Sequence, residues 1–227
     1  MLTNYALVII LAVVGILLQI VFICREHTEN YVAADILKGA ASLCFVLIGV
    51  IASSVGKNGS FASKIVAGLV CGMIGDILLN LRFVFKKNGQ KFFLAGILAF
   101  LIGHILYLTA IVPESVHTLA GVCIGAVLAA GLLTYIFKTM DVKIAFKIFG
   151  VFYLGAVIIM TVLAIDIAVF APSARALMYA VGAFLFMASD IVLIFNTFSG
   201  VTKFSLRITN LSLYYIGQLL IAACLMV

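Results

Sequence analysis

Long apolar runs are the feature that most constrains this chain. The stretch from Tyr5 to Cys24 carries no charged side chain, and the stretch from Gly182 to Leu193 carries a single one, Asp190. An α-helix needs about 20 apolar residues to cross a bilayer core about 30 Å thick. The 227 residues divide into eight such spans, at roughly 4–24, 32–55, 61–81, 92–112, 116–137, 146–169, 175–198 and 207–227.

The composition excludes an ordinary soluble domain. Hydrophobic residues make up 66% of the chain and charged residues 10%, whereas soluble domains average about 45–50% and about 25%. Lipid offers no partners to backbone polar groups, and no stretch alternates like a barrel strand, so each span must be helical. We therefore predict an all-α, polytopic membrane bundle of about eight transmembrane helices, forming a single domain over residues 1–227. The first span is too long for a signal peptide, and we expect it to be retained.

The basic residues lie at the ends of the predicted spans and not in one patch, so we do not attribute the net charge of +6 to nucleic-acid binding. Eleven of the 14 Lys and Arg residues fall at odd-numbered connections, and the even-numbered connections carry only Lys57, Lys64 and Arg175. The positive-inside rule then predicts cytoplasmic odd-numbered connections and two extracytoplasmic termini. In a bacterium the membrane would be the cell membrane.

Two aspartates lie within predicted spans, Asp76 in 61–81 and Asp190 in 175–198. A charged side chain at the bilayer centre costs roughly 2.5–3.5 kcal/mol on insertion scales, so intramembrane carboxyl groups face protein or water and mark functional sites. Two carboxyl groups that meet in a low-dielectric site cannot both be ionised, so one of them holds a proton near neutral pH. Such a pair supplies an acid and a base in one place.

The surroundings of the two aspartates indicate an internal repeat with a shift of 114 residues (190 − 76). Each aspartate lies eight residues after a glycine, Gly68 or Gly182, and the same shift takes Gly103–His104 onto Gly217–Gln218. A shift of four helices preserves direction across the membrane. The candidate halves, 1–113 and 114–227, would then be parallel four-helix repeats related by an axis along the bilayer normal, with both aspartates at similar depth in the cytoplasmic half.

Other polar side chains share faces of the predicted helices. A lone intramembrane histidine is often only a packing residue, so the repeated aspartates carry most of the functional interpretation. The polar faces consist of Asn80, one turn beyond Asp76; His104 and Tyr107, three apart; and Tyr214 and Gln218, four apart.

Lys38 lies at the start of the second predicted span, three residues after Asp35. One interpretation is an interfacial pair with a snorkelling lysine. The other is that Lys38 binds a lipid phosphate or pairs with a site carboxylate. Asp166, near the predicted outer end of its span, is expected to be solvated at the interface.

Motifs of several common enzyme classes are absent from the sequence. It contains no GxSxG elbow, no HExxH, no P-loop and no dinucleotide fingerprint. His27, His104 and His117 fall at different depths and cannot converge on one metal ion. The five cysteines are scattered without CxxC spacing and are expected to be apolar fillers. We expect no metal and no cofactor.

A set of polar, small and aromatic residues occurs in a distinctive order along the chain: Lys38; Gly75 and Asp76; Gly96, Phe100, His104 and Tyr107; Gly182, Ala183, Leu185, Phe186, Ser189 and Asp190; and Tyr214, Tyr215, Gly217, Gln218, Leu220 and Ile221. In order and spacing this set resembles the lysoplasmalogenase (YhhN-like) family of membrane proteins. The resemblance covers essentially the whole chain. Relatives tend to have Lys-Pro where this chain has Lys38 and Gly39, and some have His at the position of Gln218.

The resemblance implies hydrolysis of the vinyl ether bond of a lysoplasmalogen, a lysophospholipid, to a fatty aldehyde and glycerophosphoethanolamine or glycerophosphocholine. The residues suit this chemistry, because a general acid can protonate a vinyl ether carbon and water can capture the oxocarbenium ion that results. We predict that Asp76 and Asp190 are the catalytic residues, without assigning which is the acid. Supporting residues would be His104, Tyr107, Ser189 and Asn80, and substrate-binding residues would be Lys38, which would hold the phosphate, Tyr214, Tyr215 and Gln218.

Two other classes of function remain open at this point. A small-molecule or lipid transporter also uses intramembrane carboxyl groups and repeats, although Pro113 and Pro172 both fall in predicted outer loops and break no span. In a catalytically silent lipid-binding protein the aspartates would only cross-link helices, at about 0.6 kcal/mol per hydrogen bond.

Overall fold

The computed structural model describes residues 2–56, 59–200 and 202–227, and Lys57, counted above, lies outside them. Each predicted span corresponds to one helix, which confirms the all-α prediction. Within the described residues there is no strand, and short 3-10 turns extend three of the helix ends. The helices are α1 (Leu2–His27), α2 (Tyr31–Val55), α3 (Gly59–Val84), α4 (Gly89–Ile111), α5 (Thr118–Thr139), α6 (Ile144–Phe170), α7 (Ala174–Phe198) and α8 (Phe204–Ala223).

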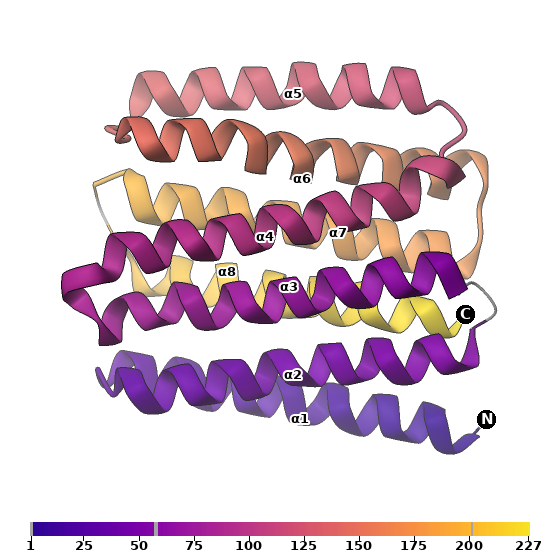
Figure 1. Cartoon of the computed structure of the whole chain (residues 1–227), viewed down its shortest axis with the longest axis horizontal. Helices are drawn as coiled ribbons and strands as arrows, with labels where there is room; N and C mark the ends of the chain where they lie inside the picture. Colours follow the sequence, from indigo (N-terminus) through magenta and orange to yellow (C-terminus); the bar gives the residue numbers. More distant parts are fainter. Residues whose placement is uncertain (1, 57–58, 201) are drawn as a thin grey trace.

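All eight helices are long and apolar enough to cross a membrane, and the chain is an integral multi-pass protein. Figure 1 shows them running along one common axis, with both chain ends at the same end of the bundle. Every helix exposes large apolar side chains on its outer surface, such as Ile9, Val127 and Leu177. An apolar exterior of this kind suits contact with lipid chains rather than water.

Helix contacts follow the same pattern in the two halves of the chain. Each helix packs on the next within α1–α4 and again within α5–α8, and the halves join mainly where α4 meets α6 and where α2 meets α8, with smaller contacts of α8 on α1 and α3. If each helix number is raised by four, with α8 followed by α1, the pair α4–α6 becomes the pair α8–α2. Two halves related by a two-fold axis would share this feature, and the internal repeat itself stays a prediction.

Glycines allow close helix approaches at corresponding places in the two halves. A Cβ atom added to Gly182 on α7 would lie 2.8 Å from the carbonyl oxygen of Gly217 on α8, and the reverse contact is also 2.8 Å. In the first half, a Cβ atom on Gly103 of α4 would lie 3.1 Å from the carbonyl oxygen of Gly68 on α3. These four glycines are the ones that the shift of 114 residues aligns, and they let the aspartate-bearing helices pack closely on their neighbours.

Asp166 is not simply solvated at the end of α6, as the sequence led us to expect. It is 9% exposed, and its carboxylate accepts hydrogen bonds from the Ser115 hydroxyl, from the backbone N–H groups of Val116 and His117, and pairs with the His117 ring at 2.9 Å. These contacts fix the connection between α4 and α5. The backbone N–H groups at the start of a helix have no hydrogen-bond partner within the helix, and a carboxylate at this place supplies one.

Candidate active site

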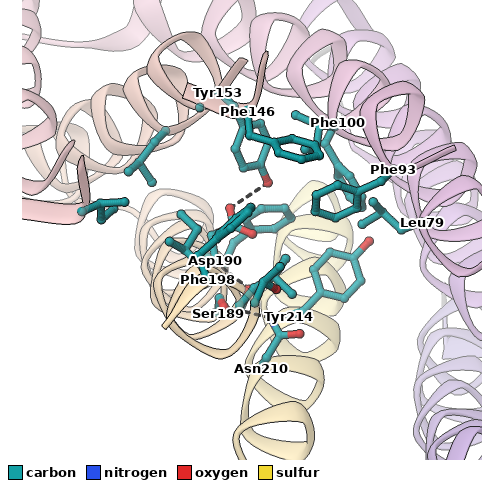
Figure 2. Close-up of a pocket in the computed structure, with 18 of the residues that line it drawn as sticks. Leu79, Phe93, Phe100, Phe146, Tyr153, Ser189, Asp190, Phe198, Asn210 and Tyr214 are labelled. Atoms are coloured by element: carbon teal, nitrogen blue, oxygen red, sulfur yellow. Dashed lines mark hydrogen bonds between the residues drawn. The ribbon is translucent and has the colours of Figure 1, made fainter. Parts of the chain in front are cut away.

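Asp76 on α3 and Asp190 on α7 line the same cavity, which has a volume of about 100 Å³. Its walls come from α2 to α8, and they are mostly apolar, with the rings of Phe93, Phe100 and Phe146 among them (Figure 2). The residues that line it lie in the half of the bundle nearest the odd-numbered connections, those after α1, α3, α5 and α7.

Asp76 is held by three polar side chains. Its Oδ1 lies 3.1 Å from the Lys38 Nζ, and its Oδ2 accepts hydrogen bonds from the Ser42 hydroxyl and the Tyr214 hydroxyl, both at 2.6 Å. Lys38 and Ser42 are one turn apart on α2, so a single face of that helix supplies both. A cation and two hydroxyl donors together satisfy an ionised carboxylate.

Asp190 has a different environment. Its Oδ2 accepts one hydrogen bond, from the Tyr153 hydroxyl on α6 at 2.7 Å, and Figure 2 shows the two side chains pointing toward each other. No Lys, Arg or His side chain among the described residues lies within ion-pair distance of it. The side chain is 4% exposed, so this carboxyl group is enclosed without a balancing charge.

The difference between the two aspartates follows from the sequence of the repeat. With the shift of 114 residues, Lys38 corresponds to Phe152, Ser42 to Ala156, and Tyr214 to Phe100. The three polar partners of Asp76 thus have apolar counterparts in the other half. The two carboxyl groups occupy related places, but their surroundings suit them to different tasks.

Lys38 takes the second of the two roles that the sequence left open. Its side chain is 3% exposed and pairs with a site carboxylate rather than lying at the surface. Tyr215 supports this arrangement, because its hydroxyl lies 3.2 Å from the Ser42 hydroxyl and donates to the Lys38 carbonyl oxygen at 3.3 Å. Tyr215 is buried outside the cavity lining.

Ser189 lines the cavity beside Asp190. Its hydroxyl donates to the Phe186 carbonyl oxygen at 2.7 Å, and its own carbonyl oxygen accepts from the Asn210 side-chain amide at 2.8 Å. The bond from Asn210 ties α8 to α7 next to the carboxyl group, so Ser189 contributes mainly to the position of Asp190.

Neither His104 nor Tyr107 lines the cavity or contacts a carboxylate directly. The His104 Nδ1 lies 2.8 Å from the Phe100 carbonyl oxygen, and its buried Nε2 has no partner among the described residues. The Tyr107 hydroxyl donates to Gln218 Oε1 at 3.1 Å, and Gln218 Nε2 donates to the Tyr214 hydroxyl at 3.4 Å. Tyr107 and Gln218 therefore reach Asp76 through Tyr214.

Asn80 is fully buried but also lies outside the cavity lining. With its amide oriented to satisfy both neighbours, the nitrogen donates to Glu26 Oε1 at 3.2 Å and the oxygen accepts from the Asp35 backbone N–H at 3.3 Å. Asn80 therefore joins α3 to α1 and α2 near the site.

Five polar residues of the site were not predicted from the sequence: Ser42, Tyr153, Thr197, Asn210 and Arg207. Ser42 follows Lys38 by one turn, and Asn210 precedes Tyr214 by one turn. That helical spacing was the available signal. Serine, tyrosine and asparagine are common at structural helix contacts, so the spacing alone would not have separated these residues from packing residues.

Among the described residues, no three or more His, Cys, Asp or Glu side chains are grouped so that they could hold a metal ion. Comparisons with curated proteins and with solved structures found no match. The family model described as YhhN family matches residues 33–225, which run from α2 to the end of α8 and include every aspartate, lysine and tyrosine of the cavity. The match covers well over half of the chain, and the chain therefore belongs to the YhhN family, the family of lysoplasmalogenases.

Proposed function

We propose that this protein is a membrane-embedded hydrolase that cleaves the vinyl ether bond of lysoplasmalogens to a fatty aldehyde and glycerophosphoethanolamine or glycerophosphocholine. The observation that carries the proposal is the cavity that Asp76 and Asp190 both line, with a cation beside only one of them. Family membership supports the class of substrate. The apolar walls suit a lipid chain.

The surroundings of the two carboxyl groups support an assignment of the acid and the base. Asp190 is enclosed with no balancing charge among the described residues, and burial disfavours the ionised form of a carboxyl group, whereas Asp76 is paired with Lys38. We therefore assign the negative charge to Asp76 and the proton to Asp190. The hydroxyl of Tyr153 orients the Asp190 carboxyl group through the hydrogen bond to Oδ2, which leaves the other oxygen for the substrate.

The reaction begins when Asp190 transfers its proton to the β-carbon of the vinyl ether, which leaves an oxocarbenium ion. The charge of Asp76 stabilises this cation, and its carboxylate accepts a proton from the water that attacks the α-carbon. The hemiacetal then collapses. Asp76 returns its proton to the departing glycerol oxygen, and Asp190 takes the proton of the hemiacetal hydroxyl, so both groups regain their starting states.

Aldehyde release by the purified protein in detergent tests the proposal. Wild-type protein should cleave a lysoplasmalogen and leave its saturated alkyl ether counterpart intact, because the alkyl ether has no carbon that can accept the proton. Asp190→Asn should lower kcat by about 100-fold or more, the usual contribution of a general acid. A wild-type rate in this variant would overturn the mechanism.

Asp76→Asn requires a second variant, because it leaves the buried Lys38 without a counter-charge and can destabilise the fold. The double variant Lys38→Met with Asp76→Asn removes both charges. We expect both variants to lose aldehyde release, and the double variant to keep the wild-type elution profile in size-exclusion chromatography. Normal cleavage by the folded double variant would show that Asp76 has no catalytic role.

The same assay separates hydrolysis from transport and from silent lipid binding. A transporter or a lipid-binding protein does not cleave the vinyl ether bond, so neither would produce aldehyde. Detergent solution also contains no sealed compartment, so transport cannot contribute to the signal. Absence of aldehyde from folded wild-type protein supplied with lysoplasmalogen would therefore exclude the proposed activity.

A further inference from the structure

Arg207 lines the cavity at the end nearest the odd-numbered connections. It belongs to the first turn of α8, on the same face as Asn210 and Tyr214, which also line the cavity. At a rise of about 1.5 Å per residue, Tyr214 lies about 10 Å deeper along the helix than Arg207. Arg207 thus lies at the end of the cavity nearest the odd-numbered connections, which we call the mouth, and Tyr214, which holds Asp76, lies deeper.

Only some of the N–H donors of the Arg207 guanidinium group are hydrogen-bonded to described residues. Its Nε and Nη2 donate to the two carboxylate oxygens of Glu26 on α1, at 3.0 and 2.7 Å. A guanidinium group carries five N–H donors in two edges, and Nη1 of Arg207 is neither bonded to a described residue nor buried. One edge therefore remains for a ligand, while Glu26 holds the group in place.

Lys38 cannot easily serve as the anion-binding group of the cavity. Its Nζ is paired with Asp76, and its side chain is 3% exposed. The Arg207 side chain is 16% exposed, and Arg207 is nearer the odd-numbered end of its helix than Lys38 is. The planar guanidinium group of an arginine can also donate to two oxygens of a phosphate at once, which the ammonium group of a lysine does less well.

We propose that Arg207 binds the phosphodiester of the lysophospholipid substrate and that Glu26 is its positioning residue. This inference rests on the proposed function. The phosphorus of a lysophospholipid is five bonds from the ether oxygen, a shorter reach than the offset between Arg207 and Tyr214, and the long arginine side chain spans the remainder. The phosphate stays at the mouth while the ether bond lies between Asp76 and Asp190.

The opposite wall suits the lipid chain. Leu133, Ile136 and Phe137 of α5 and Phe146 of α6 line the cavity on the side away from α8, and none of them is polar. A phosphate at Arg207 and an ether bond at the aspartates leave this wall for the hydrocarbon. The lipid is thereby oriented in one direction within the cavity.

The competing explanation is that the Arg207–Glu26 pair only fastens α8 to α1. The chain offers a matched control in Arg175 on α7, whose Nη2 donates to Glu114 Oε2 at 3.0 Å. This pair also joins two segments, but it lies near the even-numbered connections and does not line the cavity. A purely structural role predicts similar effects for Arg207→Gln and Arg175→Gln.

Binding of non-cleavable lipids tests the phosphate site independently of hydrolysis. The probes are a 1-O-alkylglycerophosphocholine and the 1-O-alkylglycerol of the same chain length, measured with purified protein in a phosphate-free maltoside detergent. Arg207→Gln should weaken binding of the phospholipid about 10- to 100-fold, the loss expected for charge-assisted hydrogen bonds. Its affinity for the alkylglycerol should be unchanged, and Arg175→Gln should affect neither.

Equal weakening of both probes by Arg207→Gln would overturn the inference, as would unchanged affinity for the phospholipid. Inorganic phosphate is the third probe, and it should displace the phospholipid far less well than an alkylglycerophosphocholine does. Equal potency would mean that the site takes free phosphate and would reject the lipid assignment. If Arg207→Gln behaves as predicted and wild-type protein releases no aldehyde, the proposed activity fails while the phosphate site stands.

Discussion

Tyr153 is the one hydrogen-bond partner that the structure provides for Asp190 within the described residues. Tyr153→Phe removes this hydroxyl and keeps the ring, so the Asp190 carboxyl group loses its orientation. We expect kcat for aldehyde release to fall about 10- to 100-fold with little change in thermal stability, since a misplaced general acid loses much of its contribution.

Tyr179 provides the matched control for that substitution. It is also a buried tyrosine, but its hydroxyl has no partner among the described residues, and it does not line the cavity. Tyr179→Phe should therefore leave the rate within about twofold of wild type and should not lower stability. Comparable losses of activity in both variants would show that Tyr153 acts through packing alone.

At the residue scale the sequence was informative about Asp76 and Asp190 and much less about their partners. A carboxyl group inside an apolar span is costly, which is why both could be assigned to one enclosed site. Placing a serine or a tyrosine in a membrane helix costs little free energy, so nothing in the sequence positions of Ser42 and Tyr153 identifies them as site residues. Lys38 was ambiguous for a related reason: a lysine near a helix end can snorkel or pair, and only the arrangement of α2 beside α3 decides.

At the scale of elements, the glycine contacts between α7 and α8 predict a measurable effect. A methyl group at Gly182 or Gly217 would lie 2.8 Å from a backbone oxygen of the partner helix, which cannot yield as a side chain can. Gly182→Ala and Gly217→Ala should each destabilise the protein by about 1–3 kcal/mol. Thermal unfolding in detergent should show lower midpoints for both.

Gly131 on α5 is the control for these substitutions, because an added Cβ atom meets nothing within 4 Å. Alanine is the better helix former, so Gly131→Ala should leave the midpoint unchanged or raise it slightly. Unaltered midpoints in the α7 and α8 variants would show that the two helices can separate slightly without loss.

Helix existence could be predicted from apolar run length alone, because the bilayer sets that length. The boundaries were less certain for reasons visible at particular residues. The fifth span was expected to start at about residue 116, but α5 begins at Thr118, because the backbone N–H groups of Val116 and His117 bond to Asp166 instead. Such a contact between α6 and a distant connection cannot be read from local hydropathy.

At the scale of the whole molecule, an even number of spanning helices requires both termini to lie on one side, as Figure 1 shows. Which side this is depends on charge. The excess of Lys and Arg at the odd-numbered connections predicts that both termini are extracytoplasmic. Epitope tags at the two ends should react with antibody on intact cells. Reaction of both tags only after permeabilisation would invert the orientation and place the mouth of the cavity on the outer side.

The polar residues Lys38 of α2 and Arg207 of α8 line one side of the cavity and the apolar residues of α5 line the other, and this difference bears on the fate of the products of the proposed reaction. Cleavage of a lysoplasmalogen turns one amphiphile into two compounds that prefer different solvents. The glycerophosphodiester can depart past Arg207 into water, whereas the long-chain aldehyde can partition sideways into the bilayer. The glycerophosphodiester then does not have to enter the lipid, and the long-chain aldehyde does not have to enter water. The reactive aldehyde is delivered to the membrane instead of the aqueous compartment.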